Sequence, residues 1–290
     1  MATSRERYRA ARDARMAELT GRPTYHRSLG LSTIPGLALA VVGIFTAPVL
    51  IVVGLVAALA GPLVYHLVLR SQASSAAKDQ VMHQWAKEHG WEYQPTLPLP
   101  ADVAFCRDKE RMEATDGFAG QICDVPGLIF NFTYSTFETR TTTDGQGHVS
   151  TYTEEVKHRH TVLRLAVGAV AGVDTVQLAD RGIGFLNKLT AAFGPSRQVE
   201  TESVEFNKRF SLMVNDAADQ AAVLRIFTPA LLVRLINNEF PQTTFQYERG
   251  SLAYVWEDHY DVEDLEEIEG RVASVEPLTA ALRTAVAAIH

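Results

Sequence analysis

The sequence predicts an α+β fold: an N-terminal transmembrane helical hairpin followed by one soluble domain with a mostly antiparallel sheet and several helices. Three observations lead to this prediction. The 41 residues at 29–69 include no Asp, Glu, Lys or Arg, and an apolar run of that length indicates membrane-spanning helix. Apolar and polar residues then alternate at period two, which is typical of strands with one buried face. Capped segments later in the chain predict helices.

The apolar stretch is too long for a single crossing. As one helix it would reach roughly 60 Å, about twice the hydrocarbon thickness of a bilayer. Pro48 lies near its middle, where it would interrupt a helix. We therefore expect two spans, at residues 31–46 and 49–69. Because the first span is short, a hairpin that does not fully reach the far face stays an alternative.

Small residues recur along one side of each predicted span. Such a stripe lets two helix backbones approach closely in lipid, where no hydrophobic force drives helix association. The alternative is that glycine and alanine are simply common in membrane segments. We predict that the two helices pack through Gly36, Ala40, Gly43, Ala47, Gly54, Ala58 and Gly61.

Positive charge flanks the apolar stretch on both sides, which predicts that both termini lie in the cytoplasm. The protein would then sit in the cell inner membrane or plasma membrane. A secretory signal peptide is the alternative, but its apolar core is only about 7–15 residues long. Arginines of the flanks are predicted to contact anionic lipid headgroups: Arg5, Arg7, Arg9, Arg12, Arg15, Arg22, Arg27 and Arg70.

The charge of the chain is divided unevenly. The net charge is −7, and the first 30 residues carry seven Arg against three acids, so the remainder carries −11. A negative soluble domain argues against nucleic acid as a partner. The two cysteines, Cys106 and Cys123, form neither a metal-ligand pair nor a disulfide framework, as expected in a reducing compartment. We expect both thiols to be protected from an impermeant reagent on intact cells.

These boundaries divide the chain into four parts. Residues 1–29 form a basic cytoplasmic tail and residues 30–69 the hairpin. Residues 70–100 form a linker helix followed by a connector stiffened by Pro95, Pro98 and Pro100. Residues 101–290 form the cytoplasmic α+β domain.

The alternating pattern begins soon after the connector. Residues 120–125 and 128–136 flank Pro126-Gly127, which predicts a β-hairpin. A third strand at about residues 149–167 returns after a turn at residues 144–147. If Asp144 pairs with Gly147, His160 faces Asn131 and His158 faces Thr133. Asn131-Phe132-Thr133 also matches the glycosylation pattern, which would be unused in the cytoplasm.

His158 and His160 share one strand face, so a metal site is one interpretation. No Asp, Glu or Cys is positioned to complete the ligand set, and Lys157 and Arg159 would repel a cation. A solvated basic edge is the favoured interpretation. Neither a metal nor a cofactor is predicted.

The remaining elements follow from local signals. We predict a strand at residues 173–178, a helix at 183–193, extended chain from Phe206 to Val214, a helix capped by Asp216, a helix opened by Thr228-Pro229, a hairpin around Arg249-Gly250 and a last helix opened by Pro277. Residues 257–269 hold eight acids and no base. They form either a docking strip for a basic partner or, as favoured, a solvated helix face near a helix N-terminus.

One block resembles a known family. Glu205-Phe206-Asn207-Lys208-Arg209-Phe210, then Asp216, Ala222, Leu224 and Thr228-Pro229, is similar to an uncharacterised bacterial membrane-protein family, and Gly90-Trp91-Glu92-Tyr93 resembles its post-membrane stretch. Members have an N-terminal two-span hairpin and a cytoplasmic domain of unknown function, some beside LemA-type proteins. The resemblance implies this architecture and no activity or catalytic residues.

No catalytic motif is present in the sequence: there is no nucleophile elbow, zincin motif or phosphate loop. We therefore predict no catalytic residues and expect a membrane-anchored interaction or scaffold module that binds a protein partner at the inner face of the membrane. The alternatives are an enzyme acting on a membrane-derived substrate, with a deep pocket of paired titratable groups, and a homo-oligomeric membrane assembly built from the hairpins.

Overall fold

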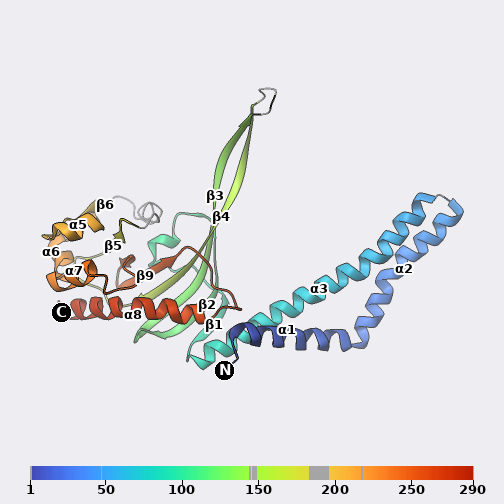
Figure 1. The fold of residues 1–290 in the computed structure, drawn as a ribbon, viewed down its shortest axis with the longest axis horizontal. Coiled ribbons are helices and arrows are strands. Elements are labelled where there is room, and N and C mark those ends of the chain that lie inside the picture. Colours follow the sequence, from blue (N-terminus) through green and yellow to red (C-terminus); the bar gives the residue numbers. More distant parts are fainter. Residues whose placement is uncertain are drawn as a thin grey trace. The chain divides into compact units, whose positions relative to one another are not determined.

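The computed structural model describes residues 2–46, 48–143, 145, 149–182, 196–216 and 218–289 (Figure 1). The chain forms two compact units. The helical unit comprises Met1–Trp85 and Val262–Asp264, and the sheet domain comprises Ala86–Asp261 and Leu265–His290. Each unit is described by itself below.

Three helices make up most of the helical unit: α1 Ser4–Gly21, α2 Pro23–Thr46 and α3 Pro48–Glu88. α1 begins at a capping box, in which the Thr3 hydroxyl accepts from the backbone N–H of Glu6 and the Glu6 carboxylate accepts from that of Thr3. Such a box satisfies two N–H groups that a helix start leaves without partners. Buried Tyr8 connects α1 to α3 through a hydrogen bond between its hydroxyl and that of Ser74.

α3 contains both the predicted second span and the predicted linker helix that follows it. One helix runs from Pro48 to Glu88 with Pro62 inside it, so the two predicted segments are continuous. A proline removes one helical hydrogen bond without ending the helix where the surrounding packing holds it. In the described part of the chain, one helix, Val52–Glu88, is long and apolar enough to cross a membrane.

The sheet domain confirms the predicted α+β class with an antiparallel sheet. Its described strands form one nine-stranded sheet in the order β1-β2-β3-β4-β9-β8-β5-β7-β6, and each described pair is antiparallel. The strands are β1 Glu92–Thr96, β2 Glu110–Ile122, β3 Val125–Thr143, β4 Val149–Ala166, β5 Thr175–Asp180, β6 Ser196–Gln198, β7 Phe210–Asn215, β8 Phe245–Glu248 and β9 Ser251–Trp256.

Both faces of this sheet are covered. The short 3₁₀ helix η1, Ala104–Cys106, places Phe105 on one face against Phe130 and Phe132. On the other face, the Tyr254 hydroxyl lies 3.1 Å from the hydroxyl of Thr279 in the long helix α8, Glu266–Ala287. Figure 1 shows the shorter helices beside the strands that close the sheet, α5 Val204–Arg209, α6 Gln220–Ile226 and α7 Pro229–Ile236.

The first hairpin turn lies three residues before its predicted position. Ile122 pairs with Val125, so Cys123 and Asp124 form a two-residue turn. Both have positive φ, at 53° and 59°, as a type I′ turn requires. Pro126 and Gly127 instead lie inside β3, opposite Gln121 and Gly120. The predicted turn at Pro126-Gly127 is therefore wrong.

The sheet domain also begins earlier than residue 101, because it starts at Ala86. Part of the predicted connector is β1, whose Tyr93 pairs with Phe118 of β2. Pro95 is tolerated there because β1 is an edge strand, in which alternate N–H groups have no sheet partner.

Local signals later in the chain succeed and fail for identifiable reasons. Thr228 caps α7 as predicted, its hydroxyl accepting from the N–H of Leu231 at 3.3 Å, and the predicted hairpin forms at Arg249-Gly250. The predicted cap of α6 is wrong, because Asp219 caps it rather than Asp216. Phe206 is helical in α5, and Pro277 lies inside α8 instead of opening it. The helix predicted at residues 183–193 lies outside the described residues.

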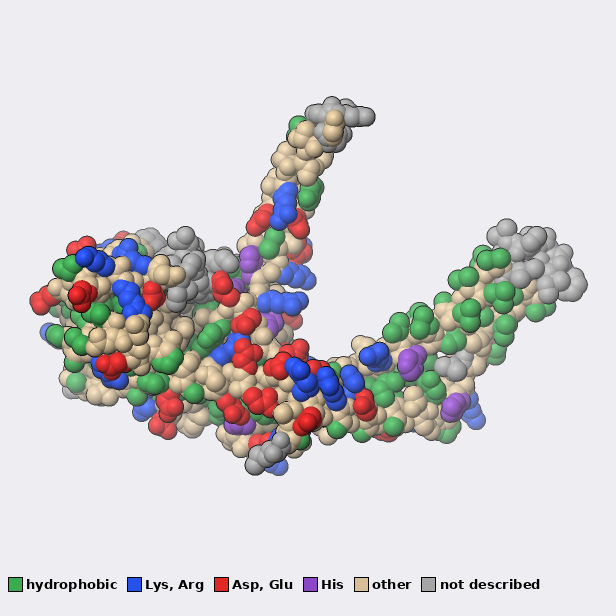
Figure 2. All heavy atoms as spheres, viewed as in Figure 1, with side chains coloured by type: hydrophobic (Ala, Val, Ile, Leu, Met, Phe, Trp, Pro, Cys, Tyr) green, Lys and Arg blue, Asp and Glu red, His purple; other side chains and the backbone are tan. Residues whose placement is uncertain are grey.

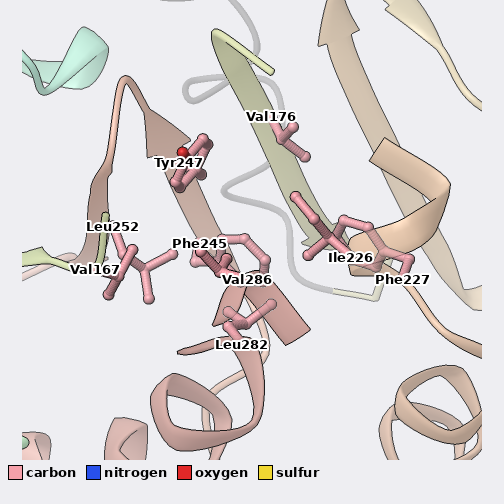
Figure 3. A pocket seen from close by; sticks show the side chains of 9 residues that line it. All are labelled: Val167, Val176, Ile226, Phe227, Phe245, Tyr247, Leu252, Leu282 and Val286. Atoms are coloured by element: carbon pink, nitrogen blue, oxygen red, sulfur yellow. The ribbon is translucent and has the colours of Figure 1, made fainter. Parts of the chain in front are cut away.

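A small apolar cavity lies between the sheet and its helices (Figure 3). Its volume is about 20 Å³. Its wall is formed by side chains of β5, β8, β9, α6 and α8 and adjoining residues, namely Val167, Val176, Ile226, Phe227, Phe245, Tyr247, Leu252, Leu282 and Val286. Its size is that of one methyl group or one water, and its lining offers a water no polar partner.

Filling this cavity should stabilise the protein. Val176→Ile adds one methyl group and keeps the branched side chain that suits a strand. We expect a gain of about 0.5–1 kcal/mol from the added apolar burial. Thermal unfolding of the detergent-solubilised full-length protein checks this, and a lower midpoint would mean that the walls cannot accommodate the methyl group.

Candidate functional site

The contact between α2 and α3 is built by the small residues of the predicted stripe. A Cβ added to Gly36 would lie 2.7 Å from the carbonyl oxygen of Gly54, and one added to Gly54 would lie 2.6 Å from that of Gly36. A Cβ on Gly61 would lie 2.6 Å from the carbonyl oxygen of Ser32. Ala40 and Ala58 are buried beside these glycines. The packing of Gly43 and Ala47 lies outside what the structure describes.

The rest of the hairpin surface is apolar and exposed. Large aliphatic side chains point outward along both helices (Figure 2), with Leu59 the most exposed at 76%. Only 17% of the most apolar stretch of α3 is buried, whereas the core helix of a globular domain is mostly buried. A contiguous apolar surface of this extent on a soluble monomer is exceptional.

Aromatic and basic side chains mark the end of this apolar surface. Tyr25 of α2 stacks on Tyr65 of α3 with ring centroids 5.9 Å apart. Arg27 and Arg70 lie close to these tyrosines in sequence. Tyrosine and arginine at the ends of an apolar segment are typical of the boundary between lipid and water.

The arginines predicted to contact lipid differ in their surroundings. Those of α1 and Arg22 just after it mostly have acidic neighbours: Arg5 pairs with Glu263 and Asp264, Arg12 with Asp13, and Arg15 and Arg22 share Glu18. The guanidinium of Arg7 donates to the carbonyl of Ala2. In the described part of the chain, Arg9, Arg27 and Arg70 form no ion pair.

The acidic stretch at residues 257–269 is partly neutralised, which neither predicted interpretation anticipates. Glu263 and Asp264 hold Arg5 within the helical unit. In the sheet domain, Asp258 and Glu267 pair with buried Arg271, and Glu269 lies 3.0 Å from His89. These acids therefore contribute to internal contacts.

β3 and β4 extend beyond the sheet as a two-stranded ribbon (Figure 1). β2 pairs with β3 only as far as Ser135, and β9 pairs with β4 only as far as Thr161. Beyond these points the two strands pair with each other out to Thr143 and Val149. Among the described residues, no strand lies on either outer edge of this ribbon. We call residues 136–143 and 149–160 the β-ribbon.

The two faces of the β-ribbon differ in chemistry. One face carries uncharged side chains towards its tip: Thr139, Thr141, Thr143, Val149, Thr151 and Thr153. On the other face, Glu138 lies opposite Glu154, and Arg140 lies near both carboxylates, 2.9 Å from Glu154 and 3.8 Å from Glu138. Val149 and Tyr152 are 66% and 47% exposed.

The register of the β-ribbon corrects our prediction for the histidines. Thr143 pairs with Val149, so the connection is longer than the predicted turn, and His160 lies opposite Phe132 while His158 lies opposite Tyr134. A register shift of one residue places a side chain opposite a residue that the prediction put on the other face of the sheet. Both imidazoles stack on the Tyr134 ring, at 4.7 Å for His158 and 5.6 Å for His160.

These contacts contradict the interpretation of a solvated basic edge for His160. Its side chain is 2% exposed, and its Nδ1 lies 3.3 Å from the carbonyl oxygen of Trp256. The neighbours Lys157 and Arg159 are exposed, as predicted. Among the described residues no group of three or more His, Cys, Asp or Glu could hold a metal ion.

Lys109 lies at the base of the β-ribbon and was not predicted as a site residue. Its ammonium nitrogen lies 4.8 Å from the centroid of the Tyr134 ring and 5.3 Å from that of Phe105. Partial burial lowers the pKa of Lys109, because desolvation disfavours the charged form. It faces a groove of about 300 Å³ formed by residues 108–110 and 134–137. No local sequence signal identifies it, since its aromatic neighbours come from distant segments.

The cysteines are poor reporters of topology in this fold. Cys106 is buried in the core, and burial raises its pKa well above the ordinary thiol value. Burial also raises the pKa of Cys123 to about 11. Because the thiolate is the reactive form, both should react slowly with thiol reagents whichever side of a membrane they occupy.

His259 gives the sheet domain a dependence on pH. Its Nε2 lies 3.2 Å from the carbonyl oxygen of Phe132 and 3.3 Å from the Thr133 hydroxyl. Burial is the largest cause that lowers the pKa of His259 from its ordinary 6.5, and Arg159 adds to it. The unfolded chain therefore binds this proton more readily than the folded protein does. The resulting stability is complete above the unfolded pKa and is lost as pH falls through the window between 6.5 and the lowered folded pKa.

We therefore expect thermal stability to fall between about pH 7.5 and about pH 5.5, and His259→Gln to reduce that fall. The glutamine keeps a donor for the Phe132 carbonyl and cannot titrate. The unfolding midpoint of the full-length protein in detergent is measured at both pH values. An equal fall in both proteins would assign the effect to other groups.

The comparisons with known proteins are sparse. Neither a protein-family model nor a curated protein matches this chain. Among solved structures, the crystal structure of the mycobacterial trehalose monomycolate transport factor A is similar to 69% of this chain and 93% of that chain, with 13% sequence identity and a TM-score of 0.39.

Proposed function

We propose that this protein is a membrane-tethered interaction module, in which the α2–α3 hairpin is the anchor and the β-ribbon binds a protein partner. The observation that carries the proposal is the β-ribbon itself, a pair of strands whose outer edges have no strand partner among the described residues. The anchor and the orientation are further parts of the proposal and rest on their own arguments.

The dimensions of the hairpin support two crossings. From Tyr25 to the end of α2 there are 22 residues, and from the start of α3 to Tyr65 there are 18. At 1.5 Å per residue these lengths are about 33 Å and 27 Å, close to the roughly 30 Å of a hydrocarbon core. The close backbone contact at Gly36 and Gly54 supplies the packing that holds two helices together in lipid.

The basic flanks favour a cytoplasmic location for both termini. Arg27 precedes the apolar part of α2, and Arg70 follows that of α3. Since neither forms an ion pair in the described structure, both guanidinium groups are available to lipid phosphates, and Arg9 shares this property. Each such contact contributes about 1 kcal/mol at an anionic surface.

Two properties of the β-ribbon support partner binding. An isolated two-stranded ribbon is only marginally stable in water, so an exposed one is commonly completed by additional contacts. Exposed edges also offer unpaired N–H and C=O groups to an incoming strand. Natural edges are commonly protected by proline or by charged side chains, especially lysine. The outer part of the β-ribbon, residues 136–143 and 149–156, contains neither proline nor lysine, and its Arg140 lies beside Glu138 and Glu154.

Removal of the β-ribbon tests the proposal. Phe137 pairs with Glu155, so residues 138–154 can be replaced by an Asn-Gly turn that closes the hairpin at that pair. Affinity purification in mild detergent should recover a stoichiometric partner with the wild-type protein and not with the shortened one. Recovery of no partner after cross-linking in several detergents, or equal recovery with the shortened protein, would overturn it.

Membrane extraction of the same two proteins provides the control. Both should stay in the membrane fraction at high salt and at alkaline pH, because the α2–α3 hairpin is unchanged. Equal thermal midpoints of the two proteins would show that the sheet domain survives the shortening.

A further inference from the structure

The edge of the sheet has a step where β2 begins and β3 continues beyond it. β2 begins at Glu110, which pairs with Ser135, and β3 runs on to Thr143. A strand added in line with β2 would therefore lie along residues 136–143 of β3. Its backbone would pair with the N–H and C=O groups of the outer edge, which among the described residues have no strand partner.

A groove occupies this step. It has a volume of about 300 Å³ and lies between residues 108–110, before β2, and residues 134–137 of β3. The aromatic side chains of Tyr134 and Phe137 and the hydroxyl-bearing Thr136 belong to its wall. The groove is thus placed to receive the end of a strand that lies along β3.

The charge in the groove is provided by Lys109. Its ammonium group is held over the rings of Tyr134 and Phe105 and is half-buried. Among the described residues no carboxylate lies within ion-pair distance of it; Asp108 and Glu110 beside it are exposed, and the charge of Asp108 acts on it only at longer range. A partly desolvated ammonium without a carboxylate partner is stabilised by an anion that enters the groove.

The direction of the sheet determines which end of a strand meets Lys109. β2 is antiparallel to β3 and starts at the step. A strand collinear with β2 and in the same direction therefore ends beside Glu110, with its carboxylate at the groove. A strand in the opposite direction would bring its ammonium terminus to Lys109, where like charges repel.

We infer that the groove binds the C-terminal carboxylate of a partner protein whose last residues add as a strand to the outer edge of β3. This inference rests on the proposed function and names the partner's binding element. Lys109 is bonded to Glu110, so the last residue of the partner lies beyond Thr136, along residues 137–143 of β3. A branched or aromatic side chain near that end packs against Phe137, as cross-strand pairs do in sheets.

The test uses a fluorescein-labelled hexapeptide of alternating valine and threonine, with either a free C-terminal carboxylate or a C-terminal amide. Fluorescence polarisation with the full-length protein in detergent micelles should give at least about tenfold tighter binding for the carboxylate form, as for a charge-assisted contact. Lys109→Met should abolish this difference, since methionine keeps the stem against the two rings. Lys157→Met, at an exposed site near the base of the β-ribbon, should preserve it.

Equal affinity for the two peptides, no binding of either, or an undiminished difference in Lys109→Met would overturn the inference. The proposed function has a separate outcome. Suppose a partner requires the β-ribbon but still binds after its own C-terminal residues are removed, and binds wild-type and Lys109→Met proteins equally well. That result would refute the carboxylate site and leave the interaction module standing.

Discussion

Replacing Gly54 by leucine is expected to separate α2 from α3 and to destabilise the hairpin by about 3 kcal/mol. A Cβ at this position would lie 2.6 Å from the carbonyl oxygen of Gly36 and 2.7 Å from the Cα of Ala40. Both are backbone atoms, which cannot turn aside as the end of a flexible side chain can. The helices must therefore move apart, and the contacts along the whole interface between α2 and α3 weaken.

The measurement is a distance between two spin labels at Leu37 and Leu55, which are exposed on α2 and α3. Pulsed electron paramagnetic resonance in detergent should give a narrow distance distribution for the parent protein and a broad, longer one for Gly54→Leu. A narrow distribution in both proteins would show that the two backbones are not in close contact.

Gly30→Leu is the matched control. Gly30 lies in the other helix of the hairpin, α2, and a Cβ there would meet nothing within 4 Å. Leucine has a higher helix propensity than glycine by roughly 0.8 kcal/mol. This variant should therefore keep the narrow distance distribution and be slightly more stable. It separates the effect of a disrupted α2–α3 contact from the effect of an added leucine.

The small residues at the interface between α2 and α3 could be predicted because close backbone approach depends on local spacing alone. Gly36, Ala40, Gly54 and Ala58 follow from i, i+4 positions on two helices and need no knowledge of distant segments. The polar continuation of α3 beyond Arg70 is predicted as a linker helix for a similar reason. It contains no local stop signal before Gly90, and α3 accordingly runs on to Glu88.

The register of the β-ribbon could not be predicted because the length of its connection is not encoded by a distinctive turn. The predicted pairing of Asp144 with Gly147 implies a two-residue turn, but the paired strands end at Thr143 and Val149. That difference places His160 opposite Phe132 and His158 opposite Tyr134. Lys109 was missed for a related reason: Phe105 and Tyr134, which surround it, are joined by the fold of η1 onto the sheet.

The opposite sheet face shows how a polar residue can be mistaken for a solvent-facing one. Asn131 alternates with Phe130 and Phe132, which predicts an exposed asparagine, but it is 3% exposed. Its Nδ2 donates to the carbonyl of Tyr260 at 3.0 Å, and its Oδ1 accepts from the N–H of Tyr260 at 3.2 Å. The segment after β9 thus covers this face, and Asn131 provides the hydrogen bonds that a strand would otherwise provide.

Asn131→Ala should therefore destabilise the sheet domain by about 3 kcal/mol or more. The substitution removes the side-chain partner of two buried backbone groups of Tyr260, each of which costs about 1–3 kcal/mol when left without one. In a domain of roughly 200 residues, such a loss lowers the unfolding midpoint by about 6–12 °C. Thermal unfolding of the full-length protein, followed by near-ultraviolet circular dichroism, measures it.

Thr142→Ala is the control, because Thr142 also forms a polar contact across β3 and β4, at 2.9 Å to the Ser150 hydroxyl, but on the exposed ribbon. Water replaces that partner, so the midpoint should change by no more than about 2 °C, as for most surface substitutions. If Asn131→Ala unfolds at the same temperature as Thr142→Ala, the segment at Tyr260 must be held by its other contacts, foremost the hydrogen bond from its hydroxyl to the carbonyl of Asp116. A large difference between the two variants would instead show that burial, rather than the presence of a polar contact, determines how much each residue contributes to stability.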